Sequence, residues 1–301
     1  MSVAVITDST AYLPADLIEG YGVHVVPLYV VLAGRSGREG EDIGPGDVAA
    51  ALSIRGARVS TSRPTPGDFV AAYRRALDQG ADRLVSVHLS SELSGTWDAA
   101  RVAAQQVGEH IVTVVDSRSA AMGSGFAVLA AARSAAAGAD AATVAASARE
   151  MAAATRTLFV VDTLEHLRIG GRIGSAAAVL GSALAVKPVL HVHEGRVVPL
   201  EKVRTSARAM NRLVQRAVET AGDRSVSLAV HHLAAPDRAE RLAAELRDRV
   251  PAVRELHVSE LGAAIGAHVG PGAVGVVVAP FWEEPDEDGS ERGLESGSEL
   301  T

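Results

Sequence analysis

The sequence predicts an α/β protein made of two α/β domains. The chain has 301 residues, which exceeds the usual length of a single domain. Short apolar runs alternate with amphipathic stretches, as is typical of strands and helices in a parallel sheet. Around residue 161 this alternation gives way to glycine-rich turns and a hairpin signal. We therefore expect a mostly parallel sheet flanked by helices over 1–161, and a mixed sheet with helices over 162–281.

The predicted elements follow from local patterns in chain order. In the first half, apolar runs predict strands over 3–6, 23–31, 83–87, 111–115 and 157–161. Helical spacing predicts helices over 14–19, 47–54, 67–77, 97–107, 122–137 and 142–153, with a glycine-rich loop or small hairpin over 33–47. In the second half, Glu194-Gly195 predicts a hairpin of 189–193 with 196–200, followed by a helix over 207–219. Strand 226–230, helix 236–249 and strand 253–258 form a βαβ pattern, and 275–279 is the last strand.

The net negative charge of the chain comes from its C-terminal tail. The net charge is −7, from 29 basic and 36 acidic residues. Residues 282–301 hold eight acids and one arginine, which leaves 28 basic and 28 acidic residues elsewhere. We expect this tail to be disordered. A neutral body with only 3% aromatic residues also disfavours nucleic-acid binding.

Composition excludes further classes of function. The chain has no cysteine, so disulfides, thiolate nucleophiles and cysteine-bound zinc are excluded. No uninterrupted apolar run reaches the ~20 residues of a membrane span, and the first residues do not resemble a signal peptide. We therefore expect a cytoplasmic protein without stable membrane insertion.

Three predicted strand-end loops are dense in hydroxyl groups, at 7–10, 60–62 and 90–96. Ligands of open α/β sheets bind at the carboxyl ends of strands, and hydroxyls beside a helix start favour an anion. The three loops are therefore candidate ligand-binding segments, and Ser94, Gly95 and Thr96 directly before a predicted helix best fit an anion site. Each loop taken alone is better explained by helix N-capping, whereas three such loops on one sheet edge favour a binding site, because capping does not require clustering.

Two glycine-rich segments carry further candidates. Arg172 follows Gly170-Gly171, and its guanidinium suits a carboxylate or phosphate, although a surface arginine after a helix end is the alternative. His268 lies in a predicted glycine-rich loop over 262–272, where a structural histidine is the alternative. The spacing of the other histidines does not favour a metal site.

No motif for catalysis is present. Ser94 lacks the Gly-x-Ser-x-Gly elbow of serine hydrolases, and neither a P-loop nor a dinucleotide fingerprint occurs. We therefore expect no catalytic residue and no cofactor. Two alternatives stay open, a Ser94/His268 acyl hydrolase or acyltransferase and a phosphate- or nucleotide-binding module at the Ser94-Gly95-Thr96 helix start.

At these residues the chain resembles the DegV family of bacterial fatty-acid-binding proteins. The segments that carry the resemblance lie at 6–10, 60–62, 64–66, 88–91, 93–96, 115–117, 122–123, 161–165, 170–173, 187–188, 202–205, 265–268 and 270–272. The resemblance covers the chain from Val3 to about Val278. The resemblance implies one long-chain fatty acid bound between the two domains.

The same resemblance implies roles for individual residues. The fatty-acid carboxylate would meet the hydroxyls of Thr61, Ser62 and Ser94, with Arg172 and His268 near the headgroup. The protein would present the bound fatty acid to a separate ATP-dependent fatty acid kinase and carry the acyl phosphate toward phospholipid synthesis. Arg204 would face that kinase.

Three positions depart from the family pattern: Arg63 stands where glutamine is common, and Trp97 and His166 where tyrosine is common.

Overall fold

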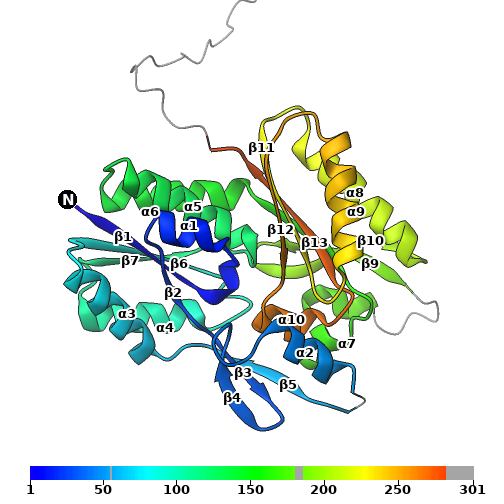
Figure 1. Ribbon diagram of the computed structural model, residues 1–301, viewed down its shortest axis with the longest axis horizontal. Helices are drawn as coiled ribbons and strands as arrows, with labels where there is room; N and C mark the ends of the chain where they lie inside the picture. The colour runs from blue at the N-terminus through cyan, green and yellow to red at the C-terminus, as the bar shows by residue number, and fades with distance from the viewer. Residues whose placement is uncertain (55, 180–185, 283–301) are drawn as a thin grey trace, which may run out of the picture.

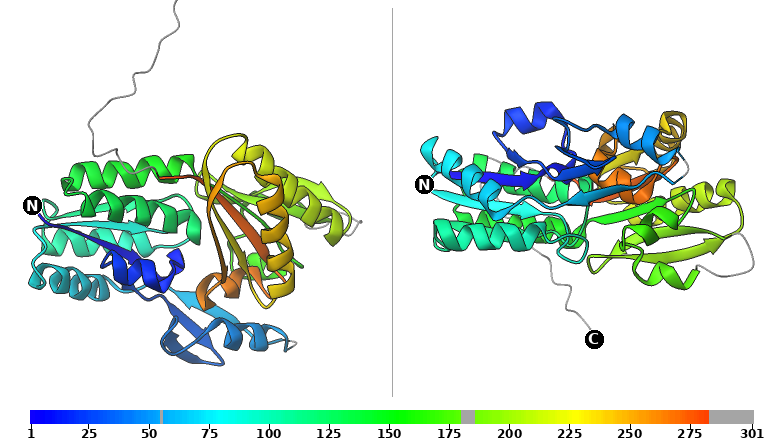
Figure 2. Two further views of the ribbon diagram at one scale, coloured as in Figure 1. Left: turned by 45° about the horizontal axis from the view of Figure 1, so that its top comes forward. Right: turned by 90° about the horizontal axis from the view of Figure 1, so that it is seen from below.

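The computed structural model describes residues 1–54, 56–179 and 186–282, which form two α/β units with a small third sheet beside them (Figure 1 and Figure 2). The predicted α/β class and the two sheet types are confirmed. The acidic tail, predicted to be disordered over 282–301, lies outside the described residues from position 283 onward. Among the helices of the described ranges, none has the length and apolar character needed to cross a membrane.

The first unit has a parallel four-stranded sheet of order β2-β1-β6-β7. Its elements are β1 (Val3–Asp8), the 3-10 helix η1 (Ser9–Ala11), α1 (Ala15–Gly20), β2 (His24–Val26), α3 (Pro66–Asp78), β6 (Arg83–His88), α4 (Thr96–Val107), β7 (Val112–Asp116), α5 (Met122–Ala136) and α6 (Ala141–Ala154). Helices α3 and α4 cover one face, and α5 and α6 cover the other (Figure 1). Apolar cores therefore lie on both faces of this sheet.

The second unit has a mixed six-stranded sheet of order β10-β9-β8-β13-β11-β12, in which only β11 and β12 are parallel neighbours. Its elements are β8 (Arg156–Val160), α7 (Glu165–Ile169), the 3-10 helix η2 (Gly174–Val179), β9 (Lys187–His193), β10 (Arg196–Val203), α8 (Ser206–Ala221), β11 (Val226–His232), α9 (Pro236–Arg249), β12 (Val253–Glu260), α10 (Ala263–Val269) and β13 (Val274–Pro280). Helices α8 and α9 pack on one face, and α5 of the first unit packs against the other.

The predicted hairpin and the βαβ pattern of the second unit are confirmed as β9–β10 and β11–α9–β12. β8 precedes the boundary predicted at residue 161, yet its partners are β9 and β13. By strand pairing, the chain therefore changes from one sheet to the other before Arg156.

A third, antiparallel sheet of order β4-β3-β5 corrects two predictions. It consists of β3 (Tyr29–Leu32), β4 (Arg35–Arg38) and β5 (Val59–Ser62), with α2 (Pro45–Leu52) packed beside it. The predicted strand over 23–31 is two strands in different sheets, because Pro27 between them cannot donate to a ladder. The segment 60–62 is part of strand β5 and not a strand-end loop.

The predicted glycine-rich loop over 262–272 is also corrected, because it contains the helix α10. The glycines at both ends of this segment concealed the helix in the sequence. Apolar residues of α10 complete an apolar cluster with α2 and the third sheet, as the adjacent ribbons in Figure 1 indicate. A helix of the second unit is thus seated on elements that come from the first 62 residues.

Candidate functional site: an apolar cavity between the units

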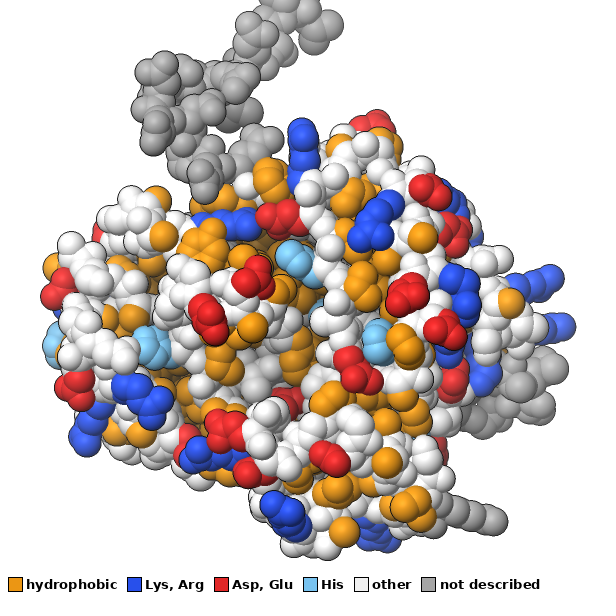
Figure 3. Space-filling view, in the orientation of Figure 1, with side chains coloured by type: hydrophobic (Ala, Val, Ile, Leu, Met, Phe, Trp, Pro, Cys, Tyr) orange, Lys and Arg blue, Asp and Glu red, His pale blue; other side chains and the backbone are white. Residues whose placement is uncertain are grey.

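A cavity of about 920 Å³, counting the space that opens toward solvent, lies between the two units. Most of its wall is apolar and comes from β8, β13, α10 and the segments after β6 and β7, including Leu93, Phe159 and Ile265. Among the described residues, the lining contains no carboxylate. In the space-filling view, hydrophobic side chains also gather in the furrow between the units (Figure 3).

In the part of the wall that the structure describes, seven polar side chains occur: Thr10, Thr61, Ser94, Thr157, Arg172, His231 and His268. Four of them were candidates from the sequence, namely Thr61, Ser94, Arg172 and His268. The structure brings these four together from both units.

Thr61 and His268 are joined directly. Thr61 Oγ1 lies 2.8 Å from His268 Nε2, across 207 positions of sequence. Thr61 faces the cavity from β5, whereas Ser62 is exposed and its hydroxyl donates to the Arg63 carbonyl at 3.3 Å. Successive side chains of a strand point to opposite sides, so Thr61 and Ser62 cannot both face the cavity. Ser62 therefore lies outside the lining.

His268 is held in a neutral form. Burial, and then the nearby Arg172 guanidinium, lower its pKa to about 4. Its Nδ1 is buried and has no partner among the described residues. A Cβ at Gly170 would overlap with this nitrogen, so the glycine makes room for the ring. His268 therefore offers one ring nitrogen to Thr61 and keeps the other unpaired.

Arg172 is fixed by main-chain acceptors. Its Nε donates to the Leu93 carbonyl at 2.9 Å, and its Nη1 donates to the Gly170 carbonyl at 2.6 Å. Leu93 precedes Ser94, so these bonds bring the guanidinium to the loop before α4. The preceding Gly171 has φ +70°, a left-handed conformation that glycine adopts without strain. The Gly-Gly-Arg turn thus positions Arg172 and admits His268.

Of the three candidates Ser94, Gly95 and Thr96, only Ser94 lines the cavity. Ser94 is half-buried and lines the cavity, and its Oγ lies 2.9 Å from Thr96 Oγ1. Thr96 is fully buried and its N–H donates to Ser94 Oγ at 3.3 Å. A Cβ at Gly95 would overlap with the Arg63 guanidinium, which lies over it. Gly95 and Thr96 therefore shape the Ser94 turn without lining the cavity.

The remaining singled-out residues lie away from the lining. Arg204 is exposed between β10 and α8. The Arg101 guanidinium lies 4.7 Å from the Trp97 ring centroid, and Trp97 Nε1 is buried with no partner among the described residues. His166 packs on Gly270, where a Cβ would overlap with its ring.

The arrangement does not favour a Ser94/His268 nucleophile. The Ser94 hydroxyl contacts Thr96, and His268 contacts Thr61 and lacks an orienting acceptor at Nδ1 within the described chain. A serine nucleophile requires a hydrogen-bonded base that a third group orients. The geometry of the acyl hydrolase is therefore not assembled.

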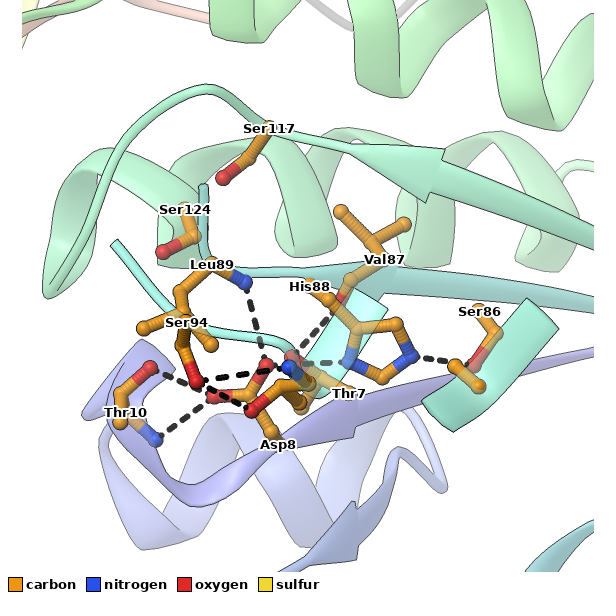
Figure 4. Close-up of polar contacts among 12 residues, drawn as sticks. Thr7, Asp8, Thr10, Ser86, Val87, His88, Leu89, Ser94, Ser117 and Ser124 are labelled. Carbon is orange, nitrogen blue, oxygen red and sulfur yellow. Dashed lines mark hydrogen bonds and ion pairs between the residues drawn. The ribbon is translucent and has the colours of Figure 1, made fainter. Parts of the chain in front are cut away.

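An Asp-His-Ser array does occur, but it lies inside the first unit (Figure 4). Asp8 Oδ2 lies 3.0 Å from His88 Nδ1, and His88 Nε2 lies 2.7 Å from Ser86 Oγ. All three side chains are buried, and Asp8 also accepts from the N–H groups of Leu89 and Thr10. This array joins the ends of β1 and β6. It accounts for Asp8 in the first hydroxyl-rich segment as a structural acceptor.

Sequence reasoning did not identify His231 or Thr157 as lining residues. His231 Nε2 accepts from the Met122 N–H at 3.2 Å, and burial lowers the pKa of His231 to about 4. Thr157 Oγ1 lies 3.1 Å from Ser119 Oγ. Both polar groups are thus satisfied within the protein. No group of three metal-ligating side chains occurs in the described part of the chain.

Comparisons with known proteins agree with this architecture. The family described as "Uncharacterised protein, DegV family" matches residues 2–280. A DegV domain-containing protein of Streptomyces coelicolor is 54% identical over 277 residues, covering 92% of this chain and 98% of the relative. The structure of a DegV family protein from Thermus thermophilus, described as fatty acid binding, is 37% identical with a TM-score of 0.88 and covers 93% of this chain and 100% of its own. DegV of Bacillus subtilis, described as a fatty acid binding protein, is 35% identical with a TM-score of 0.85, at the same coverages.

Proposed function

This chain belongs to the DegV family, and from that premise we propose that it binds one long-chain fatty acid in the cavity between its two units. The observation that carries the proposal is the cavity itself, whose wall is apolar and whose predicted polar side chains Thr61, Ser94, Arg172 and His268 lie together. The fatty acid binding described for the structures from Thermus thermophilus and Bacillus subtilis supports it.

The apolar wall supplies the free energy of binding. Burying a chain of about 15 methylenes at ~0.8 kcal/mol each gives on the order of 12 kcal/mol before the costs of ordering. The described lining holds no carboxylate that would repel the fatty-acid carboxylate, and along its apolar part it holds no charged group that would have to lose its water.

The polar end supplies orientation. The Arg172 guanidinium is held by two carbonyls and provides a fixed positive charge for the carboxylate. Ser94 and Thr61 provide hydroxyl donors beside it, and His268 orients Thr61. In this proposal the headgroup set is Thr61, Ser94, Arg172 and His268, while Ser62, Gly95 and Thr96 support the loops around it.

The protein acts in this proposal as a carrier and not as an enzyme. It presents the carboxylate to a separate ATP-dependent fatty acid kinase in the cytoplasm and carries the acyl phosphate toward phospholipid synthesis. The exposed Arg204, on the turn between β10 and α8, contributes to the kinase-binding surface. The unassembled Ser94–His268 pair supports the absence of acyl hydrolysis.

Native mass spectrometry of the purified protein tests the proposal. We expect one bound mass in the fatty-acid range, removed by delipidation and restored by added palmitate or oleate at one molecule per chain. A bound nucleotide, or a delipidated protein that takes up neither fatty acid, would refute the carrier. Turnover of acyl esters by clean protein, abolished in Ser94→Ala, would instead establish the hydrolase.

A further inference from the structure

A buried carboxyl group from the first unit holds a helix of the second. Glu39 follows β4 and is 5% exposed. Its Oε1 accepts from the Ala264 N–H at 2.7 Å and from the Tyr12 hydroxyl at 3.0 Å, and its Oε2 accepts from the Ser9 hydroxyl. Burial raises the pKa of the Glu39 carboxyl, and these three donors oppose the rise.

Tyr12 provides the second connection to the same helix. Its hydroxyl oxygen accepts from the Ile265 N–H at 3.2 Å while its proton goes to Glu39. Tyr12 has φ +48°, an unusual left-handed conformation for a bulky residue. The first N–H groups of a helix have no partner within the helix, and here Glu39 and Tyr12 accept two of them.

Gly262, immediately before α10, leaves space for the Glu39 and Tyr12 side chains. A Cβ at this position would overlap with both Glu39 Oε1 and the Tyr12 ring. Its φ of −67° is accessible to any residue, so glycine is needed for space and not for backbone conformation. The start of α10 is therefore closely fitted to two side chains that lie more than 200 positions earlier in the chain.

The helix so held forms part of the cavity wall. Ala264, Ile265 and His268 of α10 line the cavity, and His268 contacts Thr61 of β5. α10 can leave the first unit only if the Ala264 N–H separates from Glu39 and the Ile265 N–H separates from Tyr12, so that Glu39 keeps its Ser9 and Tyr12 donors but loses the third. Such a loss is costly, so it limits how often the wall opens.

We propose that Glu39 and Tyr12 form a clasp that holds α10 in place as the closing wall of the cavity and thereby sets the rate at which ligand exchanges. Both are positioning residues, because they act through α10 and are not among the residues that line the cavity between the units. The identity of the ligand rests on the proposed function, whereas the seating of α10 does not.

The first test measures α10 without any ligand. Hydrogen exchange of the full-length, delipidated protein is followed by mass spectrometry over a peptide covering 262–270. In Glu39→Ala we expect exchange of this peptide to accelerate at least tenfold, with peptides of α4 unchanged. Glu39→Gln retains a carbonyl acceptor for Ala264 and Tyr12, so it should stay within threefold of the wild type.

The second test measures ligand exchange with the fluorescent fatty acid cis-parinaric acid in stopped flow. Glu39→Ala should raise both the association and the dissociation rate constants at least tenfold, while Kd changes less than either rate. Tyr12→Phe should raise them by a smaller factor. Tyr73→Phe is the matched control, because it removes another buried tyrosine hydroxyl, bonded to Ser86 in the first unit, and should leave the rates unchanged.

Wild-type exchange over 262–270 in Glu39→Ala would overturn the clasp, and so would equal acceleration over all peptides, which indicates general destabilisation. Faster dissociation with unchanged association would also overturn it, since that is the signature of a lost ligand contact. If the wild type binds no cis-parinaric acid, the proposed function fails, and the clasp is still decided by hydrogen exchange.

Discussion

Thr61 Oγ1 and His268 Nε2 lie 2.8 Å apart and join an edge strand near the start of the chain to a helix near its end. Among the described residues, neither side chain forms a hydrogen bond within its own segment. The contact forms only when β5 and α10 are packed together around the shared apolar cluster. The polar end of the cavity is therefore a product of the contact between units.

Ser94→Ala should weaken fatty-acid binding about 10- to 150-fold, because a hydrogen bond to a charged group contributes ~1.5–3 kcal/mol. Titration calorimetry with palmitate measures the change. Ser62→Ala is the matched control, since Ser62 is exposed and outside the lining. Equal affinity of wild type and Ser94→Ala would remove Ser94 from the headgroup site.

Gly170→Ala should displace His268, because the new methyl group overlaps with His268 Nδ1. We expect a loss of affinity of about tenfold, the equivalent of one hydrogen bond at ~1.4 kcal/mol. Gly46→Ala in α2 adds the same methyl group where nothing lies within 4 Å and should bind normally. Normal fatty-acid binding by Gly170→Ala would show that the position of His268 is unimportant for the ligand.

The delipidated protein should lose stability as the pH falls from about 6.5 to 4. The pKa values of His231 and His268 are about 4 in the folded protein, against 6.5 for an unperturbed histidine. Between these values the unfolded chain binds more protons, so each histidine contributes stability that is complete above pH 6.5 and lost as the pH falls toward 4. The loss is up to about 3 kcal/mol for each histidine.

Urea unfolding at pH 7.5 and pH 5 measures this effect. His268→Gln cannot titrate in this range and should show a smaller difference in the free energy of unfolding between the two pH values. An identical difference in wild type and His268→Gln would contradict the depressed pKa of His268.

Arg204→Ala should retain bound fatty acid but support little acyl-phosphate formation with the cognate kinase and ATP. A fixed positive charge on an exposed turn suits an acidic surface of a partner. Lipid content and phosphorylation are measured on the same preparation. Loss of lipid would assign Arg204 to ligand binding, and unchanged phosphorylation would exclude it from the kinase interface.

Local pattern was sufficient to predict most elements, because their cores alternate apolar and polar positions with a clear period. The local pattern gave wrong predictions where one segment carried conflicting features. The apolar run 23–31 crosses Pro27 and serves two sheets, and three glycines in 262–270 concealed α10. Residues 60–62 were predicted to be a loop because hydroxyl side chains are common in turns, yet they form a strand of the third sheet.

The sequence by itself determined the α/β class, the mixed character of the second sheet and the segments that carry polar groups, since these follow from local periodicity and turn chemistry. Only the tertiary structure decided which of those groups meet. It turned Thr61 inward and Ser62 outward, and it brought Glu39 to Ala264 across 225 positions. The physical reason is that each segment fixes the spacing of its own side chains along a helix or strand. The partners of a side chain depend instead on how apolar faces from distant segments pack around a shared core.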